Sequence, residues 1–144
     1  MDFNKQENGA IRKMKNGELK RVLLVEDNGD TLAALELLLG LDGYEVRTAN
    51  DGSQGYRAFL DCCPDVVITD LNMPSIDGLE LIKMIRNDRK CPKTPIIVIS
   101  ADCGHGETVK AAGANYFLSK PYDYDQLKGV IDRITSEHSN GLAA

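Results

Sequence analysis

Short apolar runs rich in Val and Ile alternate along the chain with amphipathic stretches, and this alternation constrains the fold more than any other feature. Strands that are buried on both faces give continuous apolar runs, whereas the helices that cover them carry apolar residues at helical spacing. The pattern therefore predicts a parallel sheet with helices on both faces. The predicted strands are 21–25, 44–48, 65–69, 95–99 and 115–118, and the predicted helices are 31–41, 51–60, 78–87, about 107–112 and 123–137.

Five strands and five helices in alternation predict one doubly wound, flavodoxin-like α/β domain, and a length of 144 residues suits a single domain. Acidic residues are expected to cap the first, third and fifth helices, namely Asp30, Asp77 and Asp123. Two glycines, Gly104 and Gly106, disfavour helix at the start of the fourth, which is therefore expected to begin near residue 107.

The net charge of −5 is unevenly distributed. Residues 1–20 hold five basic and three acidic side chains, so the rest of the chain carries −7. A domain this acidic has little surface that neutralises phosphates, and direct nucleic-acid binding is not expected. We expect residues 1–20 and 139–144 to be flexible ends flanking a domain at 21–138.

No stretch approaches the roughly 18 to 20 uninterrupted apolar residues of a membrane span, and residues 1–20 lack the apolar centre of a signal peptide. A cytoplasmic location without membrane contact is therefore expected. The four cysteines, Cys62, Cys63, Cys91 and Cys103, show no metal-ligand spacing, and adjacent cysteines make a strained bridge. Free thiols are the prediction.

Functional groups stand where four of the predicted strands end. These groups are Glu26-Asp27, Asp70, Ser100 and Lys120. The carboxyl ends of parallel strands share one edge of the sheet, so the groups should meet there. Three carboxylates repel unless a cation joins them, and Mg²⁺ prefers such oxygen ligands. Asp70 is the predicted nucleophile, since a carboxylate forms an aspartyl phosphate once the incoming charge is neutralised.

These motifs in this order resemble the receiver domain of two-component response regulators, over about residues 21–138. The resemblance implies the strand order 2-1-3-4-5 and transfer of a phosphoryl group to Asp70 from a histidine kinase or a histidine phosphotransfer protein. It implies that Asp27, Asp70 and the backbone carbonyl of Asn72 bind Mg²⁺, while Glu26 holds a metal-bound water. Such a protein is not an enzyme, apart from phosphorylating and dephosphorylating itself.

Further roles follow from the same resemblance. Lys120 contacts Asp70 and the phosphoryl oxygens, and its bond to Pro121 is cis. Ser100 donates to the phosphoryl group, and Phe117 changes its exposure together with Ser100. The downstream partner binds the face made by the fourth helix, the fifth strand and the fifth helix. The segment from Ser100 to Lys120 is slightly shorter than usual, which leaves the shape of that face open.

Two polar residues, Asn72 and Asp102, lie two positions beyond Asp70 and Ser100, where the resembling family admits the hydrolytic water. We therefore expect fairly rapid self-dephosphorylation. The two histidines, His105 and His138, lack partners at useful spacing and are expected to be exposed and inert as phosphate carriers.

Several functions remain open at this level. The chain is either a single-domain response regulator or a receiver excised from a larger regulator or hybrid kinase. A magnesium-dependent aspartate-nucleophile phosphohydrolase fits less well. The pattern that such enzymes resemble has a second aspartate two residues after the nucleophile, and this chain has Asn72 there. A flavin protein fits poorly because Glu26 and Asp27 would repel the flavin phosphate. A scaffold that never takes phosphate is disfavoured because every expected site residue is present.

Overall fold

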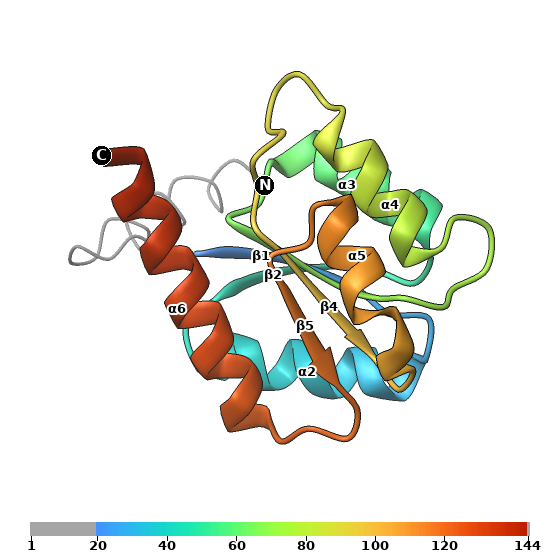
Figure 1. The fold of residues 1–144 in the computed structure, drawn as a ribbon. Coiled ribbons are helices and arrows are strands. Elements are labelled where there is room, and N and C mark those ends of the chain that lie inside the picture. Colours follow the sequence, from blue (N-terminus) through green and yellow to red (C-terminus); the bar gives the residue numbers. More distant parts are fainter. Residues whose placement is uncertain (1–19, 144) are drawn as a thin grey trace.

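The structure, a computed structural model, describes residues 20–143. Its centre is a five-stranded parallel sheet in the order β2-β1-β3-β4-β5, which confirms the predicted flavodoxin-like fold (Figure 1). The strands are β1 (Arg21–Val25), β2 (Glu45–Ala49), β3 (Val66–Asp70), β4 (Ile96–Ser100) and β5 (Tyr116–Ser119). Strands β2 to β5 each begin one residue later than predicted, so Asp70 and Ser100 are the last residues of their strands rather than the residues that follow them.

Five α-helices and one 3-10 turn connect the strands. They are α2 (Gly29–Leu41), α3 (Gly52–Cys62), α4 (Gly78–Arg86), η1 (Cys103–His105), α5 (Gly106–Ala112) and α6 (Tyr124–Ala143). The α-helix begins at Gly106 after the 3-10 turn, which agrees with the expectation from the two glycines. Helix α6 continues to Ala143, past the predicted end at residue 137. The predicted leader falls, except for Lys20, outside the described residues.

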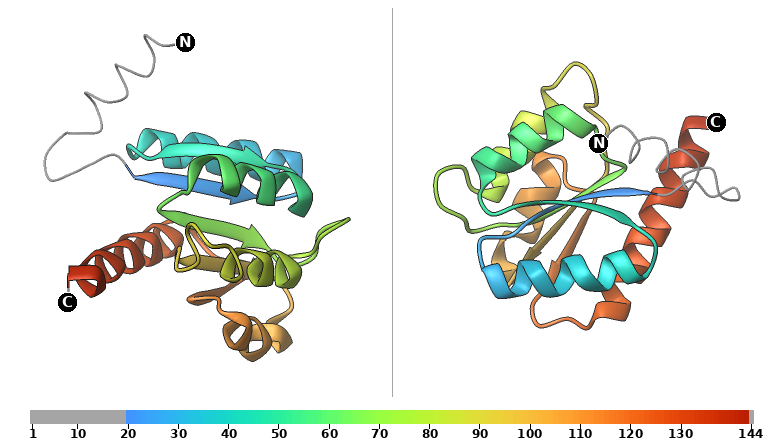
Figure 2. Two further views of the ribbon diagram at one scale, coloured as in Figure 1. Left: turned by 90° about the horizontal axis from the view of Figure 1, so that it is seen from above. Right: turned by 180° about the vertical axis from the view of Figure 1, so that it is seen from behind.

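The helices form two layers, one on each face of the sheet (Figures 1 and 2). Alternate residues of β1 point to opposite faces: Leu23 packs with α3, α4 and α5, whereas Leu24 packs with α2 and α6. Strands β3 and β4 are buried along their whole length. Burial on both faces explains why the strands read as continuous apolar runs rather than as alternating ones.

The helix caps explain where the helices begin, and one differs from the prediction. Asn28, not Asp30, caps α2, because its side chain accepts a hydrogen bond from the Thr31 N–H at 2.9 Å. Asp30 lies in the first turn, where its negative charge interacts favourably with the helix dipole. Asp77 and Asp123 are confirmed as caps of α4 and α6, each accepting an N–H at 2.9 Å.

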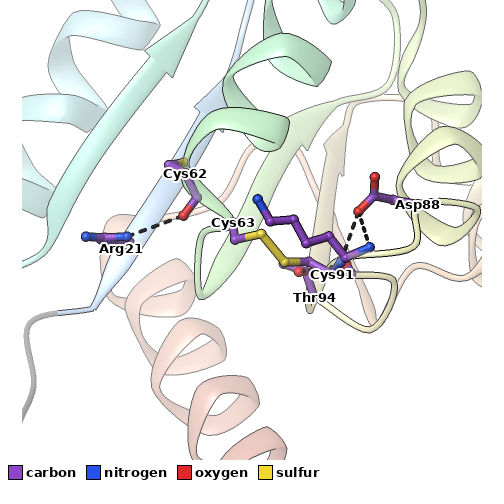
Figure 3. The surroundings of a disulfide bond; sticks show 7 residues. Arg21, Cys62, Cys63, Asp88, Cys91 and Thr94 are labelled. Carbon is purple, nitrogen blue, oxygen red and sulfur yellow. Dashed lines mark hydrogen bonds between the residues drawn. A yellow bond between two sulfur atoms is a disulfide. The ribbon is translucent and has the colours of Figure 1, made fainter.

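The prediction of free thiols is wrong for two cysteines. Cys63 and Cys91 form a disulfide that joins the end of α3 to the segment between α4 and β4 (Figure 3). Their Cα atoms lie 6.2 Å apart although they are 28 positions apart in sequence. Cys62 is a free thiol, as predicted. The pairing depends on how the loop after α4 packs beside α3, and cysteine spacing carries no information about that packing.

Residues 20–143 contain no helix with both the length and the apolar character needed to cross a membrane.

Candidate functional site

Strands β1 and β3 are neighbours, and their carboxyl ends hold the three predicted carboxylates. The register pairs Val25 with Thr69, so Glu26 follows β1 at the level where β3 ends in Asp70. Glu26 and Asp70 are buried, with 5% and 9% of their surface exposed, whereas Asp27 is exposed. The doubly wound topology thus brings all three acids to the point where the chain crosses from one face of the sheet to the other.

The three acids can act as one ligand set. One carboxylate oxygen from each of Glu26, Asp27 and Asp70 lies within 4.8 Å of the others. Burial raises the pKa of Glu26, and the negative charges of Asp70 and Asp27 raise it further. The Asn28 N–H, which donates to Glu26 Oε2 at 3.0 Å, and the charge of Lys120 both act in the opposite direction. The acids are therefore only partly compensated by the protein.

A divalent cation fits this arrangement. Hard oxygen ligands around one accessible position suit Mg²⁺, which usually takes one or two carboxylates and keeps several waters. A cation there would remove the mutual repulsion that burial makes costly. Asp27 is open to solvent and Asp70 lies beside it, so these two would hold the ion, and Glu26 is close enough to orient a bound water.

Asp70 is held from two sides. Its Oδ1 accepts a hydrogen bond from the Leu71 N–H at 2.7 Å, and Lys120 Nζ lies 3.3 Å from its Oδ2. Lys120 also lies 4.0 Å from Glu26 Oε1, so a single ammonium group faces two carboxylates. The Lys120–Pro121 peptide bond is cis, as the resemblance implies. The lysine thus faces Asp70 from the end of β5.

Gly78, at the start of α4, allows the backbone to pass close beside Asp70. A Cβ at this position would lie 2.8 Å from the Leu71 Cα and would clash with the carbonyl oxygen of Asp70. The Gly78 N–H also donates to the carbonyl of Leu71 at 2.7 Å. Only glycine permits this approach without moving the loop that carries Asn72.

Ser100 ends β4 next to the start of the loop that leads into η1. Its side chain is buried, and its Oγ accepts a hydrogen bond from the Asp102 N–H at 3.0 Å. The Lys120 N–H donates to the Ser100 carbonyl at 3.0 Å, which joins the ends of β4 and β5. Ser100 therefore shares the carboxyl edge with Asp70 and Lys120, as expected.

Phe117 lies apart from the carboxylates. Its side chain is partly buried against the cluster beneath α5, and a Cβ on Gly106 would lie 3.6 Å from its ring. The aromatic ring thus occupies the boundary between β5 and the start of α5, one strand away from Ser100.

Asn72 and Asp102 are both exposed. Asp102 Oδ1 accepts from the Gly104 N–H at 3.1 Å, and Oδ2 lies 3.0 Å from His105 Nδ1. The expectation that His105 lacks a partner is therefore wrong, although the residue is exposed as predicted. Its spacing of three residues from Asp102 becomes a contact because the segment forms a 3-10 turn. The side chain of His138 lies outside the described residues.

Sequence reasoning did not identify a cavity of about 640 Å³ beside the site. One wall is α2 and the other is the segment after β5; the lining residues are Thr31, Ala34, Leu35, Leu38, Ala101, Lys120, Pro121, Tyr122 and Tyr124. The cavity therefore runs from an apolar helix surface to the lysine that faces Asp70. The apolar surface of α2 was a signal, because Leu38, which lines this cavity, remains 38% exposed after the core is filled.

Comparison with known proteins gives a consistent result. The family model of the response regulator receiver domain matches residues 22–132. The transcriptional regulatory protein PrrA of Mycobacterium bovis is 39% identical over 112 residues, which are 74% of this chain and 46% of PrrA. This chain thus spans about half the length of that relative.

Two solved structures resemble the domain closely. The receiver domain of the sensor histidine kinase PA1611 from Pseudomonas aeruginosa, with a magnesium ion in its active site cleft, has a TM-score of 0.76 at 30% identity. That match covers 82% of this chain and 98% of the other. The response regulator TrrA of Thermotoga maritima, in complex with Mg²⁺ and BeF, has a TM-score of 0.73 at 30% identity, covering 80% and 98%. On these grounds the chain belongs to the family of response regulator receiver domains of two-component systems.

Proposed function

We propose that residues 21–138 form a phosphoacceptor receiver that takes a phosphoryl group on Asp70 from a histidine kinase or a histidine phosphotransfer protein. The observation that carries the proposal is the position of Asp70, which has Glu26 and Asp27 on one side and Lys120 Nζ 3.3 Å away on the other. Asp70 alone among the carboxylates of the described residues combines a strand end, burial and both of these neighbours.

The reaction is an in-line transfer. An oxygen of the Asp70 carboxylate attacks phosphorus, the P–N bond to the donor histidine breaks, and the imidazole leaves with the bonding electrons. Asp27, Asp70 and the Asn72 carbonyl would hold Mg²⁺, which would neutralise the charge of the incoming phosphoryl group, and Glu26 would orient a water. Lys120 stabilises the transferred phosphoryl oxygens, and the Ser100 hydroxyl donates to one of them. The protein catalyses only its own phosphorylation and dephosphorylation.

Phosphorylation then shifts an equilibrium between two conformations. Ser100 moves toward the phosphoryl group and gives up its contact with the Asp102 N–H. Phe117, which fills the space below Gly106, changes its burial and alters the face made by α5, β5 and α6. A downstream protein reads that face. A shift from 1:99 to 99:1 needs about 5.5 kcal/mol of differential stabilisation, and a smaller bias gives a graded response.

The phosphodonor docks across the cavity between α2 and the segment after β5. Its apolar wall from α2 suits a helix of the partner, and the cavity leads to Lys120 beside Asp70. The relatives include transcriptional regulators and the receiver of a sensor kinase, so both settings stay open: a single-domain regulator or a module of a longer protein. The acidic net charge supports protein partners in the cytoplasm rather than nucleic acid or membrane.

The test is incubation with acetyl phosphate or phosphoramidate and Mg²⁺, followed by intact-mass measurement. The parent should gain one phosphoryl group, and the gain should require Mg²⁺. Asp70→Asn should abolish it, while the matched control Asp61→Asn, an exposed aspartate at the end of α3, should leave it intact. Equal phosphorylation of Asp70→Asn and the parent would show that another residue is the acceptor.

A further inference from the structure

The disulfide lies at the amino edge of the sheet, opposite the carboxylates. Cys63 caps the end of α3, and Cys91 belongs to the segment between α4 and β4. Both residues are partly exposed. A cleft of about 350 Å³ opens beside the bond, and Cys91 forms part of its wall together with Asp65, Lys90 and Lys93. The crosslink is therefore within reach of small molecules.

The core gives the fold a large source of stability apart from this bond. Disulfides are needed mainly in small domains with little core, whereas here both faces of the sheet carry continuous clusters of fully buried side chains. In the cytoplasm, where the proposed kinase partner acts, disulfides are usually transient, catalytic or redox-sensing. A crosslink in a domain with a core of this extent points to a reversible role.

The backbone at Cys63 supports this interpretation. Its φ of 42° and ψ of 71° are in the left-handed region, which glycine occupies without steric cost and which is common at helix ends. A cysteine in this position is conformationally costly, and it directs its sulfur to Cys91 (Figure 3). The sequence thus keeps a reactive side chain where glycine would fit better.

The neighbouring groups differ between Cys91 and Cys62. Lys90 and Lys93 line the same cleft as Cys91, with Asp65 as the acidic residue of its wall, so the cleft is net positive. Basic surroundings of this kind are typical of reactive cysteines. Burial raises the pKa of the adjacent Cys62, so this thiol remains protonated and competes poorly. The Cys62 carbonyl accepts from Arg21 Nη1 at 3.4 Å, on the other side of the helix end from the bond (Figure 3).

We propose that Cys63 and Cys91 form a reversible dithiol–disulfide site that exchanges with low-molecular-weight thiols and disulfides of the glutathione type through the cleft lined by Lys90 and Lys93.

The exchange balances as follows. The Cys91 thiolate attacks one sulfur of the small disulfide, an S–S bond forms between them, and one small thiolate leaves. The Cys63 thiolate then attacks the Cys91 sulfur, the mixed disulfide breaks, and the second small thiolate leaves. Two protein thiols are oxidised, one small disulfide is reduced to two thiols, and the protons of the protein thiols pass to the leaving thiolates. Excess small thiol or a dithiol reverses both steps.

Opening or closing this disulfide should change the stability of the amino edge and leave the carboxylate site at the opposite edge unchanged. The bond closes a loop between positions 28 residues apart, and a loop of this length restricts the unfolded chain substantially. Reduction should lower Tm by about 10 °C in the full chain. The rate of phosphorylation by acetyl phosphate should be the same in both redox states, so this proposal and the proposed function fail independently.

The first experiment titrates the full chain with mixtures of reduced and oxidised glutathione, followed by alkylation and peptide mapping. Cys63 and Cys91 should become protected together, and Cys62 should stay alkylated throughout. Cys63→Ser should trap glutathione on Cys91, whereas Cys62→Ser, the matched control at the next position, should behave like the parent. Pairing of Cys62 with either partner, or no protection at any ratio, would overturn the proposal.

A second experiment tests reversibility and the role of the cleft. Dithiothreitol should open the bond in the native protein, and a bond that opens only in denaturant would be a permanent crosslink and would overturn the proposal. Lys90→Gln combined with Lys93→Gln should slow mixed-disulfide formation about threefold or more, while Lys110→Gln on α5 should not. Equal rates in both would remove the assigned role of the cleft. These measurements remain decisive if Cys63→Ser fails to fold.

Discussion

The two edges of the sheet differ in how their charges are compensated. At the carboxyl edge, Glu26, Asp27 and Asp70 crowd together with one lysine between two of them. At the amino edge, one cation has several partners: Arg86 donates to four acceptors on two segments, at 2.7 to 3.1 Å, namely the carbonyls of Pro92, Thr94 and Gly113 and the side chain of Asn115. The carboxyl edge thus gathers like charges that a cation could join, whereas the amino edge connects several segments of the chain through one arginine.

The difference shows where this domain places its stability. Arg86 lies at the end of α4 and donates to the segment before β4 and to the turn between α5 and β5. The side-chain oxygen of Asn115 in that turn also accepts a hydrogen bond from the Ile96 N–H at 2.8 Å. The disulfide adds α3 to the same edge. The carboxyl edge instead leaves buried acids only partly neutralised, which costs stability and which a bound cation would relieve. Removal of a charged group should therefore destabilise the fold at the amino edge but not at the carboxyl edge.

The largest expected effect is that of Arg86→Ala. Removal of the guanidinium leaves three partly buried carbonyls without this donor and should destabilise the fold by about 3 kcal/mol, while phosphorylation of the folded fraction persists. Arg89→Ala, an exposed arginine just beyond the end of α4, should change stability little. Urea unfolding of both variants measures the effect. If Arg86→Ala proved as stable as Arg89→Ala, the amino edge would not be the stabilising one.

Gly78→Ala should be the next largest, with a loss of about 2 kcal/mol. The new methyl group would push on the backbone of Asp70 and Leu71, so this variant should lose stability and phosphorylation together. Gly129→Ala is the control, because a Cβ at this helical position meets nothing within 4 Å and should stabilise by up to about 1 kcal/mol. Thermal unfolding and acetyl phosphate labelling would be compared. Normal labelling of Gly78→Ala would show that the loop adapts.

Magnesium should stabilise the protein through the carboxyl edge. At ten times its Kd the gain is about 1.4 kcal/mol, and EDTA should reverse it. Asp27→Asn should lose most of this gain and, without Mg²⁺, be at least as stable as the parent because one repelling charge is gone. The measurement is Tm at increasing Mg²⁺, with Asp61→Asn as control. An undiminished gain in Asp27→Asn would place the cation elsewhere.

The contrast between the edges also explains what could be predicted from the sequence. The site at the carboxyl edge could be predicted because its polar residues each follow or end an apolar run, and parallel strands bring such positions together. These residues are Glu26, Asp70, Ser100 and Lys120. The contacts at the amino edge could not be predicted. Arg86 gave no signal on its helix, because its acceptors are backbone carbonyls of loops whose course depends on tertiary packing.

The same reasoning accounts for the local errors. Asn28 and Asp30 are both residue types that cap helices, and which of them caps α2 depends on how the chain turns from the end of β1 into the helix. The contact between Asp102 and His105 depends on a 3-10 turn, whereas the glycines indicated only that an α-helix is disfavoured there. The disulfide required the relative placement of α3 and the segment after α4. Motifs tied to strand ends were therefore predictable, and contacts between loops were not.

The smallest expected effect concerns the lifetime of the phosphorylated state. Asn72 is exposed beside Asp70 and can hydrogen-bond an attacking water. Asp102 is already engaged by the Gly104 N–H and by His105, so its carboxylate is less available for the same task. We expect Asn72→Leu to slow self-dephosphorylation by about five- to tenfold, roughly 1 kcal/mol in the barrier, and Asp102→Leu by about twofold.

The control for the lifetime measurement is the same type of substitution at the opposite edge. Asn87→Leu, at the exposed end of α4, should leave the decay unchanged because no water reaches Asp70 from there. The decay is followed by intact mass after removal of acetyl phosphate. A larger effect at Asp102 than at Asn72 would mean that the turn releases its carboxylate once Ser100 moves, so the local contacts of the described conformation would not govern hydrolysis. Equal decay in all variants would show that the path of the water avoids both side chains.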